Sequence, residues 1–544
     1  MTNVLIEDND NKCVVSIVSL WEIAIKFVCF MLFLPSLVSW FIRQRMESIQ
    51  QAAHHPIETQ ERLLRELLQA ARLTEWGQKF DYASVKTPRQ FSERVPLQDY
   101  ESLKPFIERM MKGEQNVLWH SEITWFAKSS GTTSDRSKFI PVSQEGLNGC
   151  HFKGGRDTLA VYCHNHPGTK IFSGKGLLMG GSHQIHQLNE DCRYGDVSAV
   201  MMQNMPLLAH WLKTPELSVA LMDNWEEKLE RMTEITIRQN VTHLAGVPTW
   251  TLILLRKILE KTGKQNIADV WRNLELYIHG GVSFTPYREQ FKNLIQSDNM
   301  HYVETYNASE GFFALQDSEN SDDLLLLTDN GVYYEFLEAA SPPPPLPGRR
   351  ESERNVISKL IPLAEAKVGK TYSLVISTSS GLWRYQIGDT VQFTSIRPYK
   401  IKIAGRTKHF INVFGEEVMV DNTDRAIAET CKKTGAVVSD YTVAPIFLEG
   451  NKKGGHEWLI EFEKTPADLK EFTFLLDECL RSLNSDYDAK RFKDIALRLP
   501  AVHSLPQGTF YNWLKSKGKL GGQNKVPRLA NDRKLIEEIL TFIS

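Results

Sequence analysis

The sequence predicts an α/β fold with a large N-terminal domain of parallel-rich sheets covered by helices, followed by a smaller α+β C-terminal domain. Three observations lead to this fold class. The chain has 544 residues, too many for one hydrophobic core. Short apolar runs such as residues 176–180 alternate with longer helical patterns such as 224–238. The last part, about 409–544, carries a strand-like run at 457–463 and a helical pattern at 469–483, which indicates a separate smaller unit.

Charge and cysteine content limit the classes of function. Apolar residues make up 42% of the chain and charged residues 24%, and the net charge is -2, as in an ordinary globular protein. Such a balance provides no extended positive field, so we expect no nucleic-acid partner. The seven cysteines are scattered and lack a Cys-x-x-Cys pair, which favours reduced thiols in the cytoplasm over a disulfide framework or a zinc site.

Residues 1–42 form an apolar N-terminal extension. Residues 27–42 carry no charge, but this run of 16 residues contains Pro35 and is shorter than the ~20 residues that a membrane-spanning helix needs. The first twelve residues are acidic and no small-residue cleavage site follows, which argues against a signal peptide. The interpretation that we favour is a translation start at Met31. A membrane contact through residues 14–42 is the less favoured alternative.

The stretch 129–141 is rich in groups that bind anions. It follows an apolar run at 123–127 that is typical of a strand, so its polar residues would lie at a strand end. Seven of its first ten residues carry a hydroxyl or an ammonium group, and its glycine lets the backbone turn or approach a ligand. The residues that could surround a phosphate are Ser129, Ser130, Gly131, Thr132, Thr133 and Lys138. A solvated turn is the alternative, because the Walker spacing is missing.

Three later strand-like segments also carry residues that suit a nucleotide. Residues 274–281 run into two glycines, where a flat ligand could lie against bare backbone or the chain could simply turn. Residues 302–311 lead to a polar turn with a single carboxylate, Glu310. Asp389 follows a glycine at a strand bend and could cap a turn or accept hydrogen bonds from a ribose diol.

Histidine pairs occur at His164 and His166 and at His183 and His186. No carboxylate in these stretches completes a clear ligand set, so we interpret both pairs as ordinary surface or hydrogen-bonding histidines rather than as a zinc site. Near the end of the chain, residues 518–528 form a glycine-rich basic loop.

Taken in this order, the segments resemble the adenylate-forming superfamily of acyl-ligases and luciferases. The resemblance implies that residues 129–133 form a phosphate loop with Lys138 as a catalytic cation, and that Gly280 and Gly281 support the adenine. It further implies ATP contacts by Tyr306 and Ser309, ATP and magnesium contacts by Glu310, and ribose binding by Asp389. Arg406 would lie at the nucleotide side of a hinge centred on Lys408, and Lys525 would be the late catalytic lysine.

Three longer motifs narrow the resemblance. The sequences at 306–310, 381–389 and 523–528 resemble the auxin-responsive acyl acid–amido synthetases, the Gretchen Hagen family, and look closer to its bacterial members than to the plant ones. The similarity covers roughly residues 40–540. Two departures are that Lys138 lies one residue later than in the usual acyl-ligase loop and that Ser134 replaces a glycine.

This resemblance implies a domain division and a reaction. The large ATP- and acyl-binding domain would span 43–407, and a small mobile domain would span 408–544. We expect a cytoplasmic enzyme that uses ATP and Mg²⁺ to join a small carboxylic acid to an amino acid or another amine through an acyl adenylate. A thioester ligase that uses the same adenylate is one alternative. A non-catalytic, membrane-associated nucleotide-binding protein is the other.

Overall fold

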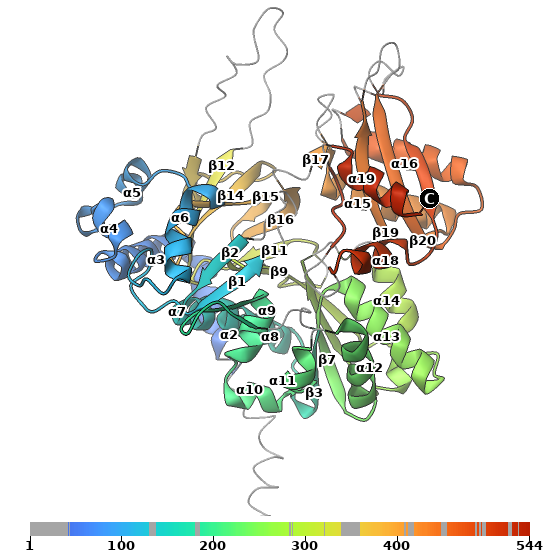
Figure 1. Cartoon of the computed structure of the whole chain (residues 1–544), viewed down its shortest axis with the longest axis horizontal. Coiled ribbons are helices and arrows are strands. Elements are labelled where there is room, and N and C mark those ends of the chain that lie inside the picture. Colours follow the sequence, from blue (N-terminus) through green and yellow to red (C-terminus); the bar gives the residue numbers. More distant parts are fainter. Residues whose placement is uncertain are drawn as a thin grey trace, which may run out of the picture.

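A twelve-stranded sheet forms the centre of the molecule (Figure 1). This computed structural model describes residues 42–543 apart from 43, 130–137, 180–184, 223, 282–283, 285–286, 320, 339–359, 407–409, 412–417, 448–453, 485–486, 489–490, 492–496, 520–524 and 531. The side chains of residues 129, 207, 208, 225, 249, 405, 406 and 410 also lie outside the description. The N-terminal extension therefore lies outside the described residues except for Ile42.

One half of the sheet is parallel. Its strands, in spatial order, are β6 (Lys213–Thr214), β3 (Lys175–Met179), β7 (Val241–Gly246), β8 (Leu276–Gly280) and β9 (His301–Ala308). Helices α12 (Trp225–Thr236), α13 (Pro248–Thr262) and α14 (Arg288–Leu294) share a hydrophobic core with β7 and β8. The expected strands and helices of this region are confirmed, with ends shifted by one to three residues.

The other half of the sheet is antiparallel. It continues from β9 through β10 (Gly311–Leu315), β11 (Leu324–Leu326), β16 (Tyr399–Arg406), β15 (Tyr385–Ile396), β14 (Thr371–Thr378), β12 (Val332–Glu338) and β13 (Leu360–Pro362). Short connections join β9 to β10 and β15 to β16. Two neighbouring strands joined by so short a connection must be antiparallel, because parallel strands need a long crossover connection. The predicted fold class is confirmed, and the parallel strands are confined to one half of the sheet.

A second sheet and most of the helices that precede β7 cover this antiparallel half. The sheet has the order β2 (Lys138–Val142), β1 (Trp125–Ser129), β5 (Arg193–Gly195) and β4 (His186–Gln187). The helices are α2 (Arg45–His54), α3 (Pro56–Ala71), α4 (Glu75–Lys79), α5 (Pro88–Arg94), α6 (Tyr100–Met111), α7 (Gln144–Gly146), α8 (Phe152–Asn165), α9 (Val197–Gln203), α10 (Leu207–Trp211) and α11 (Leu217–Ala220). Most of them share the largest hydrophobic core with β10 to β16.

The C-terminal part has sheets and cores of its own. It comprises β17 (Phe410–Ile411), β18 (Val418–Met419), α15 (Val420–Thr434), β19 (Val437–Ile446), β20 (Gly455–Lys464), α16 (Leu469–Leu483), β21 (Ala501–Leu505), α18 (Thr509–Ser516) and α19 (Lys534–Ile543). The predicted helix at 469–483 is confirmed. In Figure 1 this part, coloured orange to red, lies above α13 and α14.

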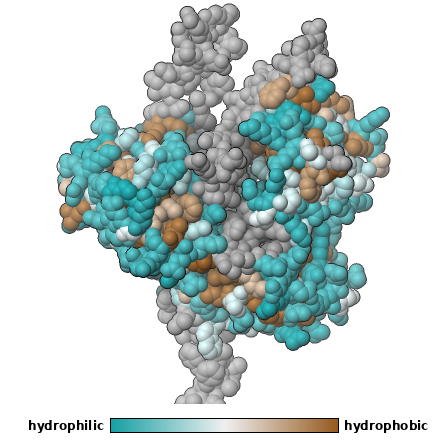
Figure 2. Space-filling model, viewed as in Figure 1, coloured by the Kyte–Doolittle hydropathy of each residue, from teal (hydrophilic) through white to brown (hydrophobic). Residues whose placement is uncertain are grey.

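The described surface is largely hydrophilic on the face drawn in Figure 2, where hydrophobic residues form small scattered patches. Its exposed large apolar side chains come from many elements, and single exposures of this kind are normal for a globular protein. Among the described residues, none of the helices has the length and apolar character that crossing a membrane requires.

Candidate active site

The predicted phosphate loop connects the two strands of a hairpin. Strands β1 and β2 are antiparallel, and Ser129 at the end of β1 lies opposite Lys138 at the start of β2. Ser130, Gly131, Thr132 and Thr133 lie outside the described residues, as does the side chain of Ser129. The Lys138 ammonium lies 5.8 Å from the centre of the Tyr100 ring. The hairpin thus places one predicted cation at the base of the loop.

Tyr306 and Asp389 meet across the sheet. The Tyr306 hydroxyl donates a hydrogen bond of 2.8 Å to Oδ2 of Asp389, and both side chains are buried. Tyr306 lies on β9 and Asp389 on β15, and three other strands stand between these two in the sheet order. The antiparallel half of the sheet therefore curls far enough to bring its distant strands into contact. This curl assembles two predicted nucleotide contacts.

The β9–β10 turn brings Ser309 and Glu310 to the same region. The buried side chain of Tyr385 lies in this region. Burial raises the pKa of Tyr385 well above its usual value, and the negative charge of the nearby Glu310 carboxylate raises it further. Asp389 also contributes to the negative field at this hydroxyl. The sequence analysis did not single out Tyr385, although it lies four residues before Asp389 in the same motif.

The end of β8 receives the predicted late lysine. Lys525 donates a hydrogen bond from Nζ to the carbonyl oxygen of Gly281. Gly281 has φ +78, and a Cβ atom there would lie 2.7 Å from that Nζ, so the lysine occupies the space that a side chain would take. A Cβ atom on Gly280 would lie 2.5 Å from the carbonyl oxygen of Thr305 on β9. The close approach of the Thr305 backbone therefore favours glycine at position 280, and the positive φ favours glycine at position 281.

Arg528 fixes the segment that carries Lys525. Its guanidinium is ion-paired with Asp440 on β19 and lies 4.4 Å from the Tyr441 ring centre. It also donates a hydrogen bond of 2.8 Å to the hydroxyl of Tyr287, which precedes α14 of the large domain. Arg528 ends the motif at 523–528, but the motif alone indicated no role for it. Its partners lie far away in the sequence and could not be predicted from the neighbouring residues.

Two more polar contacts connect the C-terminal part to helices of the large domain. Gln290 on α14 donates a buried hydrogen bond of 3.0 Å to the backbone of Val438. Arg256 on α13 forms an ion pair of 2.6 Å with Glu463 on β20. The C-terminal part is therefore docked on the α13–α14 side of the parallel strands, at the edge where Lys525 reaches Gly281.

The predicted hinge begins where β16 ends. Arg406, its last residue, pairs with Asp389 in the β15–β16 ladder, so these two backbone positions are neighbours. The Arg406 side chain and Lys408 lie outside the described residues. The nucleotide role of Arg406 and the hinge role of Lys408 stay predictions.

A buried ion pair supports the strand that carries Asp389. Arg384 binds Glu335 on β12 through two hydrogen bonds of 2.8 and 3.0 Å, and both side chains are buried. Arg384 also donates to the carbonyl oxygens of Ser92 and Val95, next to α5. The motif arginine thus joins the N-terminal helices to the sheet, a structural role that sequence inspection missed.

Glu304 lies on β9 two residues before Tyr306 and has an unusual electrostatic environment. Burial raises the pKa of Glu304 to about 7. The Arg288 cation opposes this shift, whereas Asp322 and Asp424 reinforce it and Lys402 slightly opposes it. Asp424 belongs to α15 of the C-terminal part, so the docked arrangement contributes to this shift.

We expect Glu304→Gln to stabilise the protein above pH 7. The folded-state pKa is raised above the unfolded value, so wild-type stability falls as pH rises from about 4.5 through 7. The side chain keeps some exposure, so we expect a gain of about 1–3 kcal/mol at pH 8 and little change at pH 4. Thermal midpoints over this pH range measure the difference. Glu260→Gln, on the exposed side of α13, is the matched control, and parallel pH profiles for wild type and Glu304→Gln would contradict the prediction.

Two solved structures of ligases have the same fold as this chain. The GH3.15 acyl acid amido synthetase superposes with a TM-score of 0.74 at 15% identity, covering 92% of this chain and 96% of that chain. A 2-hydroxyisobutyryl-CoA ligase in the postadenylation state superposes with a TM-score of 0.57 at 12% identity, covering 89% of this chain and 91% of that chain. The fold is that of the adenylate-forming ligases.

Sequence comparison then identifies the family. Sequence models of the GH3 family match residues 45–300 as its N-terminal domain, 325–406 as its central domain and 421–534 as its C-terminal domain. The indole-3-acetic acid-amido synthetase GH3.4 of Arabidopsis thaliana is 24% identical, covering 89% of this chain and 91% of the relative. The 4-substituted benzoates-glutamate ligase GH3.12 of the same plant is 22% identical, covering 89% and 94%. The chain belongs to the GH3 family, as the motifs predicted.

Proposed function

We propose that this protein activates a small carboxylic acid with ATP and transfers the acyl group from the acyl adenylate to an amino acid or another amine. The observation that carries the proposal is the docking of Lys525 on the Gly281 carbonyl. A protein that only bound a nucleotide would have no use for a lysine delivered from a second domain. The names of two relatives, an indole-3-acetic acid-amido synthetase and a benzoate–glutamate ligase, support amide formation with an amino acid.

The reaction has two substitutions. A carboxylate oxygen attacks the α-phosphorus, the bond to pyrophosphate breaks, and the acid becomes a mixed anhydride with a good leaving group. The amine nitrogen then attacks the acyl carbon, the bond to AMP breaks, and the nitrogen loses a proton. The first step requires positioning and charge neutralisation more than a protein nucleophile. Lys525 and Lys138 are the two cations that we assign to it.

The described residues fit ATP and Mg²⁺. The Asp389 carboxylate, oriented by Tyr306, suits a ribose diol, and the glycines at the end of β8 leave backbone for the adenine. The Glu310 carboxylate is a hard oxygen ligand of the kind that magnesium prefers, and the ion would neutralise phosphate charge when bound. We assign Ser309, the hydroxyl-rich loop at 129–133 and Arg406 to further contacts with the nucleotide, through their oxygen, N–H and guanidinium groups.

We further propose that residues 43–407 and 408–544 are separate domains that rotate about Lys408. The hydrophobic core of the large domain ends with Ile401 on β16, and the next core begins with Ile411. Rotation at this point would bring Lys525 to the acid for adenylation and remove it for amide formation. We also place the enzyme in the cytoplasm, which agrees with the five free cysteines among the described residues.

Carboxylate-dependent exchange of labelled pyrophosphate into ATP tests the proposal directly. A panel of small aromatic and aliphatic acids would be assayed first, and each amino acid would then be added to an acid that supports exchange. Exchange followed by AMP release and amide product with an amino acid is the expected result. Turnover with coenzyme A but with no amino acid would instead establish a thioester ligase. Binding of ATP without exchange for any acid would favour a non-catalytic nucleotide-binding protein.

We expect Tyr306→Phe to weaken ATP binding while kcat changes little. The hydroxyl orients the Asp389 carboxylate, and a hydrogen bond to a charged group contributes about 1.5 kcal/mol. The KM for ATP should therefore rise about tenfold. Pyrophosphate exchange at varied ATP concentrations measures this KM, and Tyr399→Phe on β16 is the matched control. An unchanged KM for ATP would argue against the nucleotide role of the Tyr306–Asp389 pair.

A further inference from the structure

A second cluster of polar side chains lies away from the nucleotide residues. His166 directly follows α8, His301 is the first residue of β9, and Glu319 lies in the connection between β10 and β11. Tyr306 is five residues further along β9 than His301, roughly 16 Å at the usual rise of a strand. The cluster is therefore separate from the candidate active site and occupies the opposite end of the same strand.

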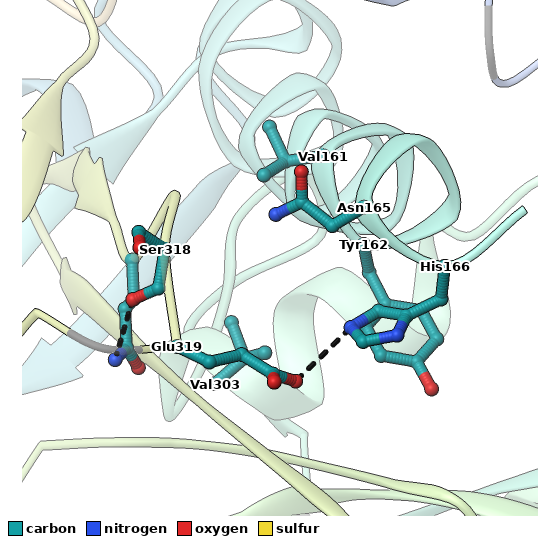
Figure 3. A pocket seen from close by; sticks show the side chains of 8 residues that line it. Val161, Tyr162, Asn165, His166, Val303, Ser318 and Glu319 are labelled. Atoms are coloured by element: carbon teal, nitrogen blue, oxygen red, sulfur yellow. Dashed lines mark hydrogen bonds and ion pairs between the residues drawn. The ribbon is translucent and has the colours of Figure 1, made fainter.

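The three side chains converge on one point. Oε1 of Glu319 lies 3.0 Å from Nε2 of His166 and is also in contact with Nδ1 of His301. The two imidazole rings are 4.0 Å apart between centroids, and the three donor atoms all lie within 4.8 Å of one another. Figure 3 shows the Glu319 carboxylate pointing towards the His166 ring, with the Tyr162 ring beside it.

These separations suit a shared metal ion. Bonds of about 2.1 Å from a tetrahedral zinc ion place its ligand atoms roughly 3.4 Å apart. The donor atoms need only small side-chain rotations to reach such an arrangement, because the backbone positions are held by a helix end and a strand end. Two imidazoles and one carboxylate favour zinc and neighbouring transition metals, whereas Mg²⁺ and Ca²⁺ prefer sites made of oxygen atoms alone.

The side chains around the two histidines hold their rings in place. The Tyr162 ring packs 4.5 Å from the His166 ring and 5.7 Å from the His301 ring, which limits the rotation of both imidazoles. Val161 and Val303 line the same pocket and provide an apolar wall. The two histidine side chains are largely buried, at 23% and 24% exposure, whereas Glu319 is 42% exposed and leaves a path for an ion to enter.

We propose that His166, His301 and Glu319 bind one divalent transition-metal ion of the zinc class, with water completing its coordination. The ion joins α8, β9 and the connection before β11, three segments that are separated by more than a hundred residues at the widest. The residues next to His166 in the sequence do not indicate a zinc site, because the carboxylate and the second imidazole come from distant segments.

Cobalt titration of the full-length, tag-free, chelator-treated protein tests the proposal. We expect a saturable visible d–d absorption with one Co²⁺ per chain, lost on addition of Zn²⁺ and retained in excess Mg²⁺. Glu319→Gln and His301→Gln should each raise the dissociation constant for Co²⁺ at least about tenfold. His164→Gln, an exposed histidine on α8, is the matched control and should leave it unchanged.

Two results would overturn the proposal. The first is the absence of saturable Co²⁺ absorption, which would mean that the three side chains form only a hydrogen-bonded trio. The second is an equal Co²⁺ affinity of wild type and Glu319→Gln. Glu319 lies in an exposed connection, so Glu319→Gln should fold even if His301→Gln does not. Thermal midpoints measured without metal show whether each of the two variants is folded.

Discussion

We expect Lys525→Ala to abolish acyl adenylate formation but to leave amide formation from supplied acyl adenylate nearly intact. The ammonium of Lys525 is the cation that the C-terminal domain delivers to the end of β8, where it contacts the Gly281 carbonyl. Loss of one group that stabilises developing charge costs about a hundredfold or more in rate. Pyrophosphate exchange measures the first half-reaction, and amide product from chemically prepared acyl adenylate measures the second.

The matched control for Lys525 is Lys519→Ala. Lys519 is exposed and lies six residues earlier in the same basic segment, so it tests whether general positive charge matters. We expect both half-reactions of Lys519→Ala to match wild type. Equal losses of Lys525→Ala in the two half-reactions would count against a role confined to adenylation.

We expect Arg384→Met to destabilise the protein by about 3–5 kcal/mol, the cost of leaving one member of a buried ion pair without its partner. Both side chains are about 5% exposed, so water cannot replace the lost guanidinium at Glu335. Burial raises the pKa of Glu335 and the Arg384 cation opposes this, so the carboxyl group of the variant should take up a proton. The loss should consequently be smaller at pH 5 than at pH 8.

Denaturant unfolding followed by tryptophan fluorescence measures the Arg384 effect, since Trp383 is adjacent and buried. Arg89→Met is the matched control, because Arg89 forms an ion pair of 2.8 Å with Glu93 while exposing 87% of its side chain. An exposed pair of this kind contributes little to stability, because solvent screens the two charges. The double variant Arg384→Met, Glu335→Leu should recover part of the loss. Similar losses for Arg384→Met and Arg89→Met would show that the buried pair has no special role.

Local patterns were enough to predict much of the fold. The helix at 469–483 has apolar residues at helical spacing, and the short apolar run at 176–180 coincides, within one residue at each end, with strand β3. The antiparallel pairing in the other half of the large sheet could not be predicted from local patterns. Its strands are also apolar runs, and their directions depend on connection lengths and on the curl that brings β15 towards β9.

The residues of the candidate site also fall into two groups: those that a local motif indicates and those that only the folded structure brings together. Glu310 lies between β9 and β10 and Asp389 lies on β15, and both belong to short motifs, so the sequence alone was enough to propose them as site residues. The contact of Lys525 with Gly281 joins positions 244 residues apart, and the Arg384–Glu335 pair joins two different strands. Such pairs depend on which segments the fold brings together. The His166–His301–Glu319 cluster was missed for this reason.

Gly281 couples the two domains through a single position. The Lys525 ammonium occupies the space where a side chain at position 281 would begin, 2.7 Å from a Cβ atom. An alanine there would be held in the left-handed backbone conformation that side chains disfavour, and the flexible end of the lysine would have to move aside. The backbone of one domain thus limits where a side chain of the other domain can lie.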